Sequence, residues 1–160
     1  MNKVFLLTGG NMGNRKDNLA IAYKHISVLC GHIINSSSVY ETAAWGKTDQ
    51  PSFLNQVLEI QTALTAPQLL KKILDIEKLT GRIRKEKYGP RIIDIDILLF
   101  NDEIHNDPLL KIPHPELQNR RFVLEPLAEI APEIIHPVLK KSIIDLLAIC
   151  PDKLEVTRIK

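Results

Sequence analysis

The sequence has few features that predict a membrane segment or a disulfide bond. None of its apolar runs approaches the length of a membrane-spanning helix, and the opening run, Val4 to Leu7, is too short for a signal peptide. There are only two cysteines, Cys30 and Cys150, each at the end of an apolar helical pattern. We expect both to be buried free thiols in a protein of a reducing compartment, by default the cytoplasm.

An excess of one charge sign is also missing. The formal net charge is only +2, from 21 Lys and Arg against 19 Asp and Glu. This is too small to predict a nucleic-acid-binding surface, so positive charge matters only where it is clustered. The length of 160 residues and the hydrophobic content of 44% predict a single domain, residues 1–160, with a sizeable core. No spare apolar helix face stands out, which favours a monomer.

A phosphate-binding P-loop is absent too. Gly9, Gly10 and Gly13 lie in a turn after a short buried strand, Val4 to Thr8, but no Lys-Ser/Thr pair follows at the required spacing. We interpret this turn as a strand-to-helix connection; the alternative is a flexible turn in which glycine lets the backbone approach a ligand.

What is present is an alternation of strand and helix patterns. The order is strand, helix, strand, strand, helix, strand, over residues 4–8, 15–30, 32–42, 53–62, 65–81 and 92–100. Asn14 and Thr65 are the expected helix N-caps, and Gly31 and Gly81 the expected ends. The order predicts an α+β fold: a ferredoxin-like β-α-β-β-α-β core with an antiparallel sheet, helices on one face and the other face open.

Beyond residue 100 the pattern predicts a hairpin and helices. Asn101 and Asp102 form a turn into a short strand at 103–105, and three prolines exclude a helix over 106–116. A helical turn or two, interrupted by Pro126, is expected over 122–130. Ser142 caps a final helix, and the sequence from Asp152 onward predicts no element.

Residues 82–100 contain the main cluster of charged residues with possible catalytic or binding roles. Alternation along the strand gives one face four apolar residues, Ile93, Ile95, Ile97 and Leu99, and the other face Asp94 and Asp96, followed by Leu98 and Phe100. Residues two apart on a strand are roughly 6.5 Å apart, so both carboxylates can hold one divalent ion or a neighbouring pair. A D-x-D pair on a strand is often only part of the solvent-exposed face of an edge strand. The apolar flanks instead predict a central strand, in which carboxylates need cations.

Five basic residues precede this strand: Arg82, Arg84, Lys85, Lys87 and Arg91. Carboxylates hold Mg²⁺ while guanidinium and ammonium groups neutralise phosphate oxygens, so the combination predicts a metal–polyphosphate ligand. Farther along, His114 lies between two prolines and shortly before Arg120 and Arg121. It is either a structural histidine or part of a second donor cluster for phosphate.

Residues 81–100, G-R-I-R-K-E-K-Y-G-P-R-I-I-D-I-D-I-L-L-F, resemble a stretch of the 6-hydroxymethyl-7,8-dihydropterin pyrophosphokinase (HPPK) family, G-R-x-R, a variable loop and G-P-R-x-x-D-x-D-(I/L)-L. Four weaker elements follow the family order: Y-E-T at 40–42, F-L-N at 53–55, P-H-P at 113–115 and N-R-R-F at 119–122. The resemblance covers the chain to about Pro151. It implies transfer of pyrophosphate from ATP to the hydroxyl of 6-hydroxymethyl-7,8-dihydropterin in folate biosynthesis, with release of AMP.

The resemblance also implies roles for particular residues. Asp94 and Asp96 would hold two Mg²⁺ ions and, with Arg82 and Arg91, form the catalytic set. The expected ATP-binding residues are Glu77, Arg82, Arg84, Lys85, Arg91, His114 and Arg120. The expected pterin-binding residues are Thr42, Ala43, Trp45, Phe53, Asn55, Asp94 and Phe122. Among these, Asn55 would read the amide edge of the pterin, and Phe53 and Phe122 would stack on its two faces. The expected partners are small molecules, without nucleic acid or membrane.

The sequence departs from the family pattern at several positions: Gly10 in place of serine, Trp45 in a loop that usually contains proline, Tyr88 where tryptophan is common, and Leu109 and Lys111 in place of polar contacts. We expect these changes to affect loop geometry and nucleotide affinity and to leave the acid pair intact.

Two other functions stay open. A two-metal nucleotidyltransferase also uses D-x-D on a strand, but it places a Gly-Ser helix start just before that strand, whereas Gly10 is 84 residues before Asp94. A non-catalytic ferredoxin-like module, such as an RNA-binding sheet, would present aromatic and basic side chains instead of two acids. No side chain is an obvious general base for the pterin hydroxyl, and metal activation or a water relay would serve instead.

Overall fold

The computed structural model describes residues 1–43, 51–80 and 92–159. In chain order its elements are β1 (Asn2–Gly10), α1 (Arg15–Leu29), β2 (His32–Ser36), β3 (Val39–Thr42), β4 (Phe53–Thr62), α2 (Ala66–Leu79), β5 (Asp94–Phe100), β6 (His105–Asp107), β7 (Leu110–Ile112), a 3₁₀ turn (Leu117–Asn119), α3 (Arg121–Ile130), α4 (Ile143–Ala148) and β8 (Val156–Ile159). The predicted order of strands and helices is therefore present.

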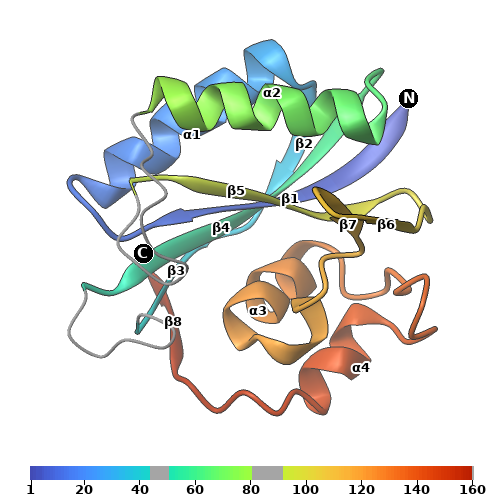
Figure 1. Ribbon diagram of the computed structural model, residues 1–160. Helices are drawn as coiled ribbons and strands as arrows, with labels where there is room; N and C mark the ends of the chain where they lie inside the picture. The colour runs from blue at the N-terminus through green and yellow to red at the C-terminus, as the bar shows by residue number, and fades with distance from the viewer. Residues whose placement is uncertain (44–50, 81–91, 160) are drawn as a thin grey trace.

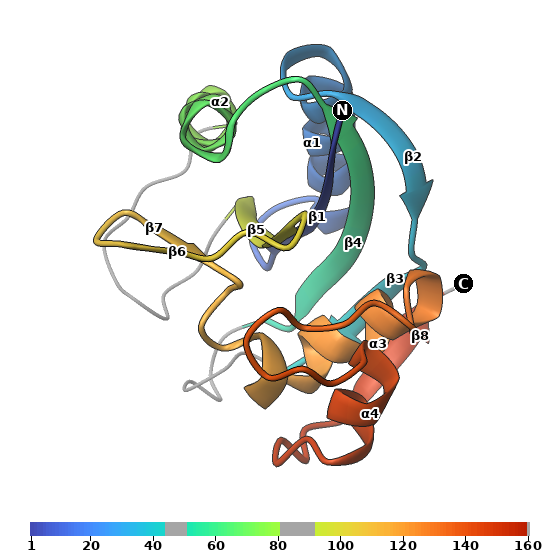
Figure 2. The ribbon, with the colours of Figure 1, turned by 90° about the vertical axis from the view of Figure 1, so that its right-hand side faces the viewer.

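The main sheet has the order β5-β1-β4-β3-β8, and β2 pairs with β4 beside β3. Each neighbouring pair is antiparallel. With β2 and β3 taken as two halves of one irregular strand, this is the expected ferredoxin-like core, extended by β8. Helices α1 and α2 lie on one face of the sheet, and α3 and α4 lie against the other (Figure 1; Figure 2). The α+β fold is confirmed.

The second face of the sheet is less open than the sequence suggested. Phe5, Leu7 and Val57 on that face are buried in one cluster with Leu124 and Leu127 of α3, and α4 adds further apolar side chains to it. The end of this face where β1 finishes and β5 begins carries Asn55, Asp94 and Asp96, while Glu59 and Gln61 lie toward its other end.

A bulge in β5 overturns part of the predicted alternation. Phe5 of β1 pairs with Leu99, but the next residue, Leu6, pairs with Ile97, so Leu98 is an extra residue in β5. An extra residue reverses the side-chain parity beyond it. Phe100 accordingly joins Ile97 in the core under α1 and α2, whereas Leu98 and Leu99 pack toward α3. The predicted faces were right for residues 93–98 and wrong for the last two.

The position of β5 in the sheet is also different from the expectation. The sequence predicted a central strand, but β5 is at the edge of the sheet. Its apolar character arises because side chains are buried on both of its faces, with α1 and α2 on one side and α3 on the other. Neighbouring groups cover its outer backbone edge: Glu77 accepts the Ile95 N–H at 2.9 Å, and the Leu98 carbonyl accepts the His114 N–H at 3.0 Å.

The predicted helix starts are confirmed. Asn14 accepts a hydrogen bond from the Asp17 N–H, Thr65 forms a capping box with Gln68, and Ser142 accepts from the Asp145 N–H. The end of α1 has a more specific cause than the usual glycine cap. A β-carbon at Gly31 would collide with the Gln61 carbonyl oxygen of β4, so the close approach of the two backbones requires glycine here.

Several local expectations need correction. The predicted strand 32–42 is broken at Ser37 and Ser38 into β2 and β3. The short strand expected at 103–105 begins at His105 and pairs with β7. Helix α3 runs unbroken through Pro126, which lies on its buried face. The tail forms β8, which pairs antiparallel with the outer edge of β3.

The two cysteines are free and buried, as predicted. Burial raises the pKa of Cys30 to about 12, although the nearby Lys72 acts in the opposite direction. A search of the described residues finds no helix with the length and apolar composition to cross a membrane.

Candidate active site

A polar row crosses four strands on the face opposite α1 and α2. Tyr40 of β3 pairs with Asn55 of β4, Asn55 pairs with Gly9 of β1, and Gly9 pairs with Asp94 of β5. Residues directly paired across antiparallel strands point to the same side, with β-carbons about 4.5–5.5 Å apart. Side chains far apart in the sequence therefore meet in one line. We call Tyr40, Asn55, Gly9 and Asp94 the polar row.

The next two predicted residues flank this row. Asp96 pairs with Leu7, one step farther along β5 on the same face as Asp94. Phe53 is two residues before Asn55 in β4 and is half-buried. The register therefore places Phe53 and Asn55 on the same face of the sheet as the acid pair.

Gly9 makes room for the Asn55 side chain. A β-carbon at position 9 would collide with Asn55 Oδ1 and come within 2.9 Å of the Leu54 carbonyl oxygen. The carboxamide thus lies directly over the backbone of β1, where only a glycine fits. Asn55 is 4% exposed, and its Nδ2 atom has no hydrogen-bond partner within the described part of the chain. An unsatisfied buried donor costs about 1–3 kcal/mol, so it marks a position where a ligand acceptor would bind.

Asp94 and Asp96 begin the strand β5 and are both half-buried. Between them, the Ile95 N–H points outward and donates to Glu77 Oε2 of α2 at 2.9 Å. Glu77 is 3% exposed, so this buried carboxylate holds the segment that carries both acids. Among the described residues no group of three or more His, Cys, Asp or Glu side chains is placed to hold a metal. A metal here would need ligands from a bound molecule in addition to the two acids.

His114 is positioned beside the same strand. It follows a cis Ile112–Pro113 peptide bond, and its backbone N–H donates to the Leu98 carbonyl. The imidazole Nδ1 accepts the Glu116 N–H at 3.1 Å, which leaves Nε2 to carry the ring proton. Burial and then the positive charge of Arg120 lower the pKa of His114, against the opposing effect of Asp94 and Glu116. The ring is therefore a neutral donor near both an acid and a cation.

Arg120 and Phe122 lie at the start of α3. The guanidinium carbon of Arg120 is 5.8 Å from the centre of the Phe122 ring, within the range of a cation–π contact. Phe122 is half-buried at the margin of the cluster under α3. The expected phosphate-binding and pterin-stacking residues at 120–122 are thus adjacent.

The remaining expected residues are less informative. Thr42 is buried, and its hydroxyl donates to the Glu155 carbonyl at 3.1 Å, while Ala43 is exposed. Leu109 is at the tip of the β6–β7 hairpin and is 86% exposed. Five predicted site residues lie outside the described residues: Trp45, Arg82, Arg84, Lys85 and Arg91. Tyr88, which departs from the family pattern, lies outside them as well.

Two members of the polar row were not assigned by sequence. Tyr40 belongs to the recognised Y-E-T element, but its proximity to Asn55 depends on the register of β3 on β4. Gly9 was interpreted only as part of a turn. Its role follows from the distance between β1 and the Asn55 side chain, for which the sequence carries no signal.

The fold, the polar row and the flanking Asp96 together define a class of protein: an α+β domain of ferredoxin-like topology with two carboxylates and a buried carboxamide on one face of its sheet. Comparison with known proteins gives the particular family. The family description 7,8-dihydro-6-hydroxymethylpterin-pyrophosphokinase (HPPK) matches residues 5–132. The chain belongs to the HPPK family and is a pyrophosphokinase of folate biosynthesis, with ATP-dependent chemistry.

Individual relatives agree. The chain is 44% identical over 143 residues to the 2-amino-4-hydroxy-6-hydroxymethyldihydropteridine pyrophosphokinase of Aquifex aeolicus, covering 89% of each chain. It is 41% identical to the enzyme of the same name from Synechocystis, covering 87% of this chain and 71% of that one. Among solved structures, HPPK-DHPS of Plasmodium falciparum matches with a TM-score of 0.74 and 22% identity. That match covers 92% of this chain but only 43% of the longer one, and it shows the fold alone.

Proposed function

We propose that the chain transfers pyrophosphate from ATP to the hydroxymethyl oxygen of 6-hydroxymethyl-7,8-dihydropterin, and that the pterin binds over the polar row. The names of the curated relatives support this substrate. The observation that carries the assignment of the site is Asn55, whose buried amide nitrogen has no partner within the described residues.

Asn55 suits a pterin because the amide edge of this ring offers both a donor and an acceptor. A carboxamide has a complementary pair, with Nδ2 as donor and Oδ1 as acceptor. Gly9 leaves no free space beneath Oδ1, so the side chain is held in one plane. Phe53 and Phe122, both half-buried near the row, would then stack on the two faces of the ring.

Asp94 and Asp96 would hold two Mg²⁺ ions together with the phosphates of ATP. Magnesium in proteins is usually bound by one or two carboxylates plus substrate phosphates and water, which fits a pair of acids without a third protein ligand in the described residues. When bound, the ions would neutralise phosphate charge and lower the pKa of the pterin hydroxyl. Glu77 would keep the two acids in register through the Ile95 N–H.

The nucleotide would lie on the side of His114 and Arg120. The Nε2–H of a neutral His114 can donate to a phosphate oxygen, and Arg120 supplies positive charge. As the resemblance implies, Glu77, Arg84 and Lys85 complete the ATP site, with Arg82 and Arg91 as catalytic cations. The pterin hydroxyl oxygen would attack the β-phosphorus and release its proton to water, and the bond from that phosphorus to the α-phosphate oxygen would break, so that AMP leaves.

Four other features of the proposal come from the sequence. Thr42, Ala43 and Trp45 would border the pterin, the whole chain 1–160 would be one domain, and the protein would work as a cytoplasmic monomer. These features stay predictions.

Asn55 gives the sharpest test of the pterin site. Asn55→Asp keeps the shape and the Oδ1 acceptor but replaces the Nδ2 donor with a second, charged acceptor, so pterin affinity measured by calorimetry should fall by about tenfold or more. Gln61→Ala, at an exposed position on the far end of β4, is the matched control and should bind normally. Normal pterin binding by Asn55→Asp would contradict the assignment.

A further inference from the structure

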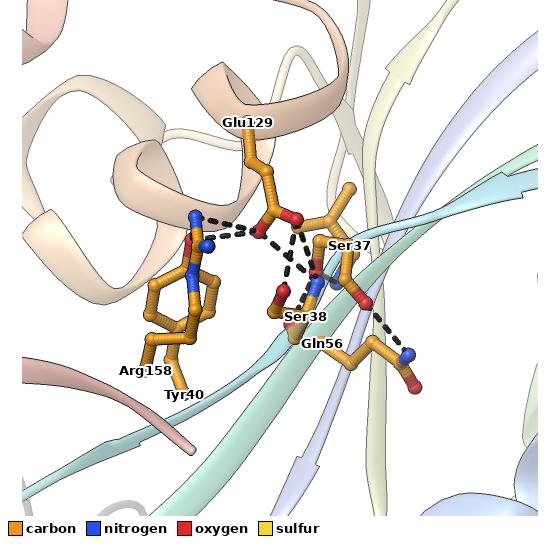
Figure 3. A network of polar contacts seen from close by, with 7 residues as sticks. Ser37, Ser38, Tyr40, Gln56, Glu129 and Arg158 are labelled. Carbon is orange, nitrogen blue, oxygen red and sulfur yellow. Dashed lines mark hydrogen bonds and ion pairs between the residues drawn. The ribbon is translucent and has the colours of Figure 1, made fainter. Parts of the chain in front are cut away.

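A second polar cluster lies at the other end of α3 and shares only Tyr40 with the residues discussed above. Glu129 accepts four hydrogen bonds from β3 and the residue before it: the Ser38 N–H at 3.0 and 3.1 Å to its two oxygens, the Ser38 hydroxyl at 2.9 Å and the Tyr40 hydroxyl at 2.7 Å. Arg158 of β8 is 3.9 Å from the same carboxylate. Figure 3 shows Glu129 reaching from the helix between Tyr40 and Ser38.

The hydrogen bonds of this cluster connect α3 to the break between β2 and β3. Ser37 lies in that break, where its hydroxyl accepts the Val57 N–H at 2.9 Å and its carbonyl accepts the Gln56 side chain at 2.9 Å (Figure 3). The break is therefore fixed to β4, and Glu129 ties the helix to the break. Because a ten-residue helix is a rigid rod of about 15 Å, fixing one end also limits the position of the other. That other end carries Arg120 and Phe122.

Tyr40 connects the cluster to the polar row. Its backbone pairs with Asn55, so its ring stands on the same face beside the carboxamide, and its hydroxyl donates to Glu129. The ring is 5% exposed and lies 5.9 Å from the Arg158 guanidinium carbon. Burial and then the hydrogen bond to Glu129 raise the pKa of Tyr40, so the hydroxyl is a neutral donor to a charged acceptor. Such charge-assisted hydrogen bonds are stronger than neutral ones.

We propose that Glu129 is a positioning residue for the pterin site: by binding Ser38 and Tyr40 it holds Tyr40 against Asn55 and sets the distance between Phe122 and the polar row. Glu129 does not touch the substrate in this arrangement. It acts on the pterin site through both Tyr40 and α3 but on Arg120 of the nucleotide site through α3 alone, so it affects the pterin site more. The inference rests on the proposed function, because it needs the pterin to lie over the row.

The test compares pterin and nucleotide binding in a set of variants. Glu129→Ala should weaken pterin binding by about tenfold, measured by calorimetry, with a matching rise in the pterin KM and less than about a twofold change in kcat and in the ATP KM. Glu129→Gln keeps the shape and an acceptor and should recover most of the affinity. Tyr40→Phe keeps the ring but loses the hydroxyl, and it should show about a threefold loss that largely disappears in the Glu129→Ala background.

A control separates positioning from general loss of stability. Thr62 lies at the far end of β4, where its buried hydroxyl donates to the Cys30 carbonyl and accepts the Leu64 N–H. Thr62→Val should lower the unfolding midpoint as Glu129→Ala does but leave pterin affinity unchanged.

Three outcomes would overturn the inference. One is a Glu129→Ala protein that is destabilised but binds pterin normally, and the second is an equal loss of pterin and ATP affinity. The third outcome applies if the Glu129→Ala protein does not fold: the inference is then overturned if the Tyr40→Phe protein binds pterin with normal affinity. Failure of the unaltered protein to bind pterin would reject the proposed function as well.

Discussion

The substitution Gly9→Ala isolates the most specific feature of the site, the close contact between β1 and the Asn55 carboxamide. The added β-carbon would collide with Asn55 Oδ1 and press on the Leu54 carbonyl oxygen at 2.9 Å. The backbone cannot move far within a central strand, so the carboxamide must rotate away. Overpacking of this kind costs about 1–3 kcal/mol of stability. Two ligand hydrogen bonds of about 0.5–1.5 kcal/mol each would be lost, which predicts pterin binding weaker by about 5-fold to 150-fold.

The chain offers a matched control in Gly31→Ala. A β-carbon there would collide with the Gln61 carbonyl oxygen, at the opposite end of β4 and away from the polar row. Both variants should unfold at lower denaturant concentration, but only Gly9→Ala should bind pterin more weakly in calorimetry. If the two variants lose the same stability and retain the same pterin affinity, Gly9 serves only to pack the sheet and the reasoning about Asn55 is refuted.

Three further predictions concern single side chains. Asp96→Asn should lower kcat about 100-fold or more at saturating Mg²⁺ without lowering the unfolding midpoint, because it removes one of two neighbouring carboxylates that repel each other without metal; near-normal turnover would reject the metal assignment. Cys30, with a pKa raised to about 12 by burial, should resist iodoacetamide at mildly alkaline pH in the native protein and react after unfolding; rapid labelling of the native protein would contradict its burial. Glu129 has a pKa below its ordinary value, because its hydrogen bonds from Tyr40 and Ser38, together with Arg158, outweigh the effect of burial. Its stabilisation is therefore present above the unfolded pKa and lost as the pH falls through the folded one, so the stability advantage over Glu129→Gln should shrink in acid; an advantage independent of pH would show that the charge is irrelevant.

Much of the fold could be predicted because local signals and the overall fold agree. The caps at Asn14, Thr65 and Ser142 marked helix starts, and the alternation in β4 separated Leu58 from Asn55 and Val57. Parity within β4 puts Phe53 and Asn55 on the face opposite Leu54 and Leu58, and the register of the sheet places that face with the acid pair. Parity needs only an unbroken strand, which β4 and the first half of β5 provide.

The errors arise where tertiary contacts override local patterns. A bulge at Leu98 reverses parity without any sign in an otherwise continuous apolar run, so Phe100 was assigned to the wrong face. The same apolar run suggested a central strand. A strand whose two faces are both covered by helices is as apolar as a central strand, so composition does not distinguish an edge strand from a central one here. Pro126 was expected to interrupt α3, but the buried helix tolerates it.

In the site too, some residues could be predicted from the sequence and others depend on tertiary contacts. Residue type singled out Asp94 and Asp96 as candidate metal ligands, since carboxylates suit Mg²⁺, and the family resemblance added Asn55 as a candidate pterin ligand. The roles of Gly9, Tyr40 and Glu129 depend on which backbones and helix ends approach one another. That information exists only in the strand register and in the packing of α3.

The most direct test of the account is the identity of the nucleotide product. The protein should be incubated with ATP, Mg²⁺ and 6-hydroxymethyl-7,8-dihydropterin, and the nucleotides and pterins then separated by chromatography and identified by ³¹P NMR. The account predicts AMP and the pterin diphosphate in equal amounts, and no product when pterin is omitted. Formation of ADP with a pterin monophosphate, or no turnover by the folded protein, would contradict it.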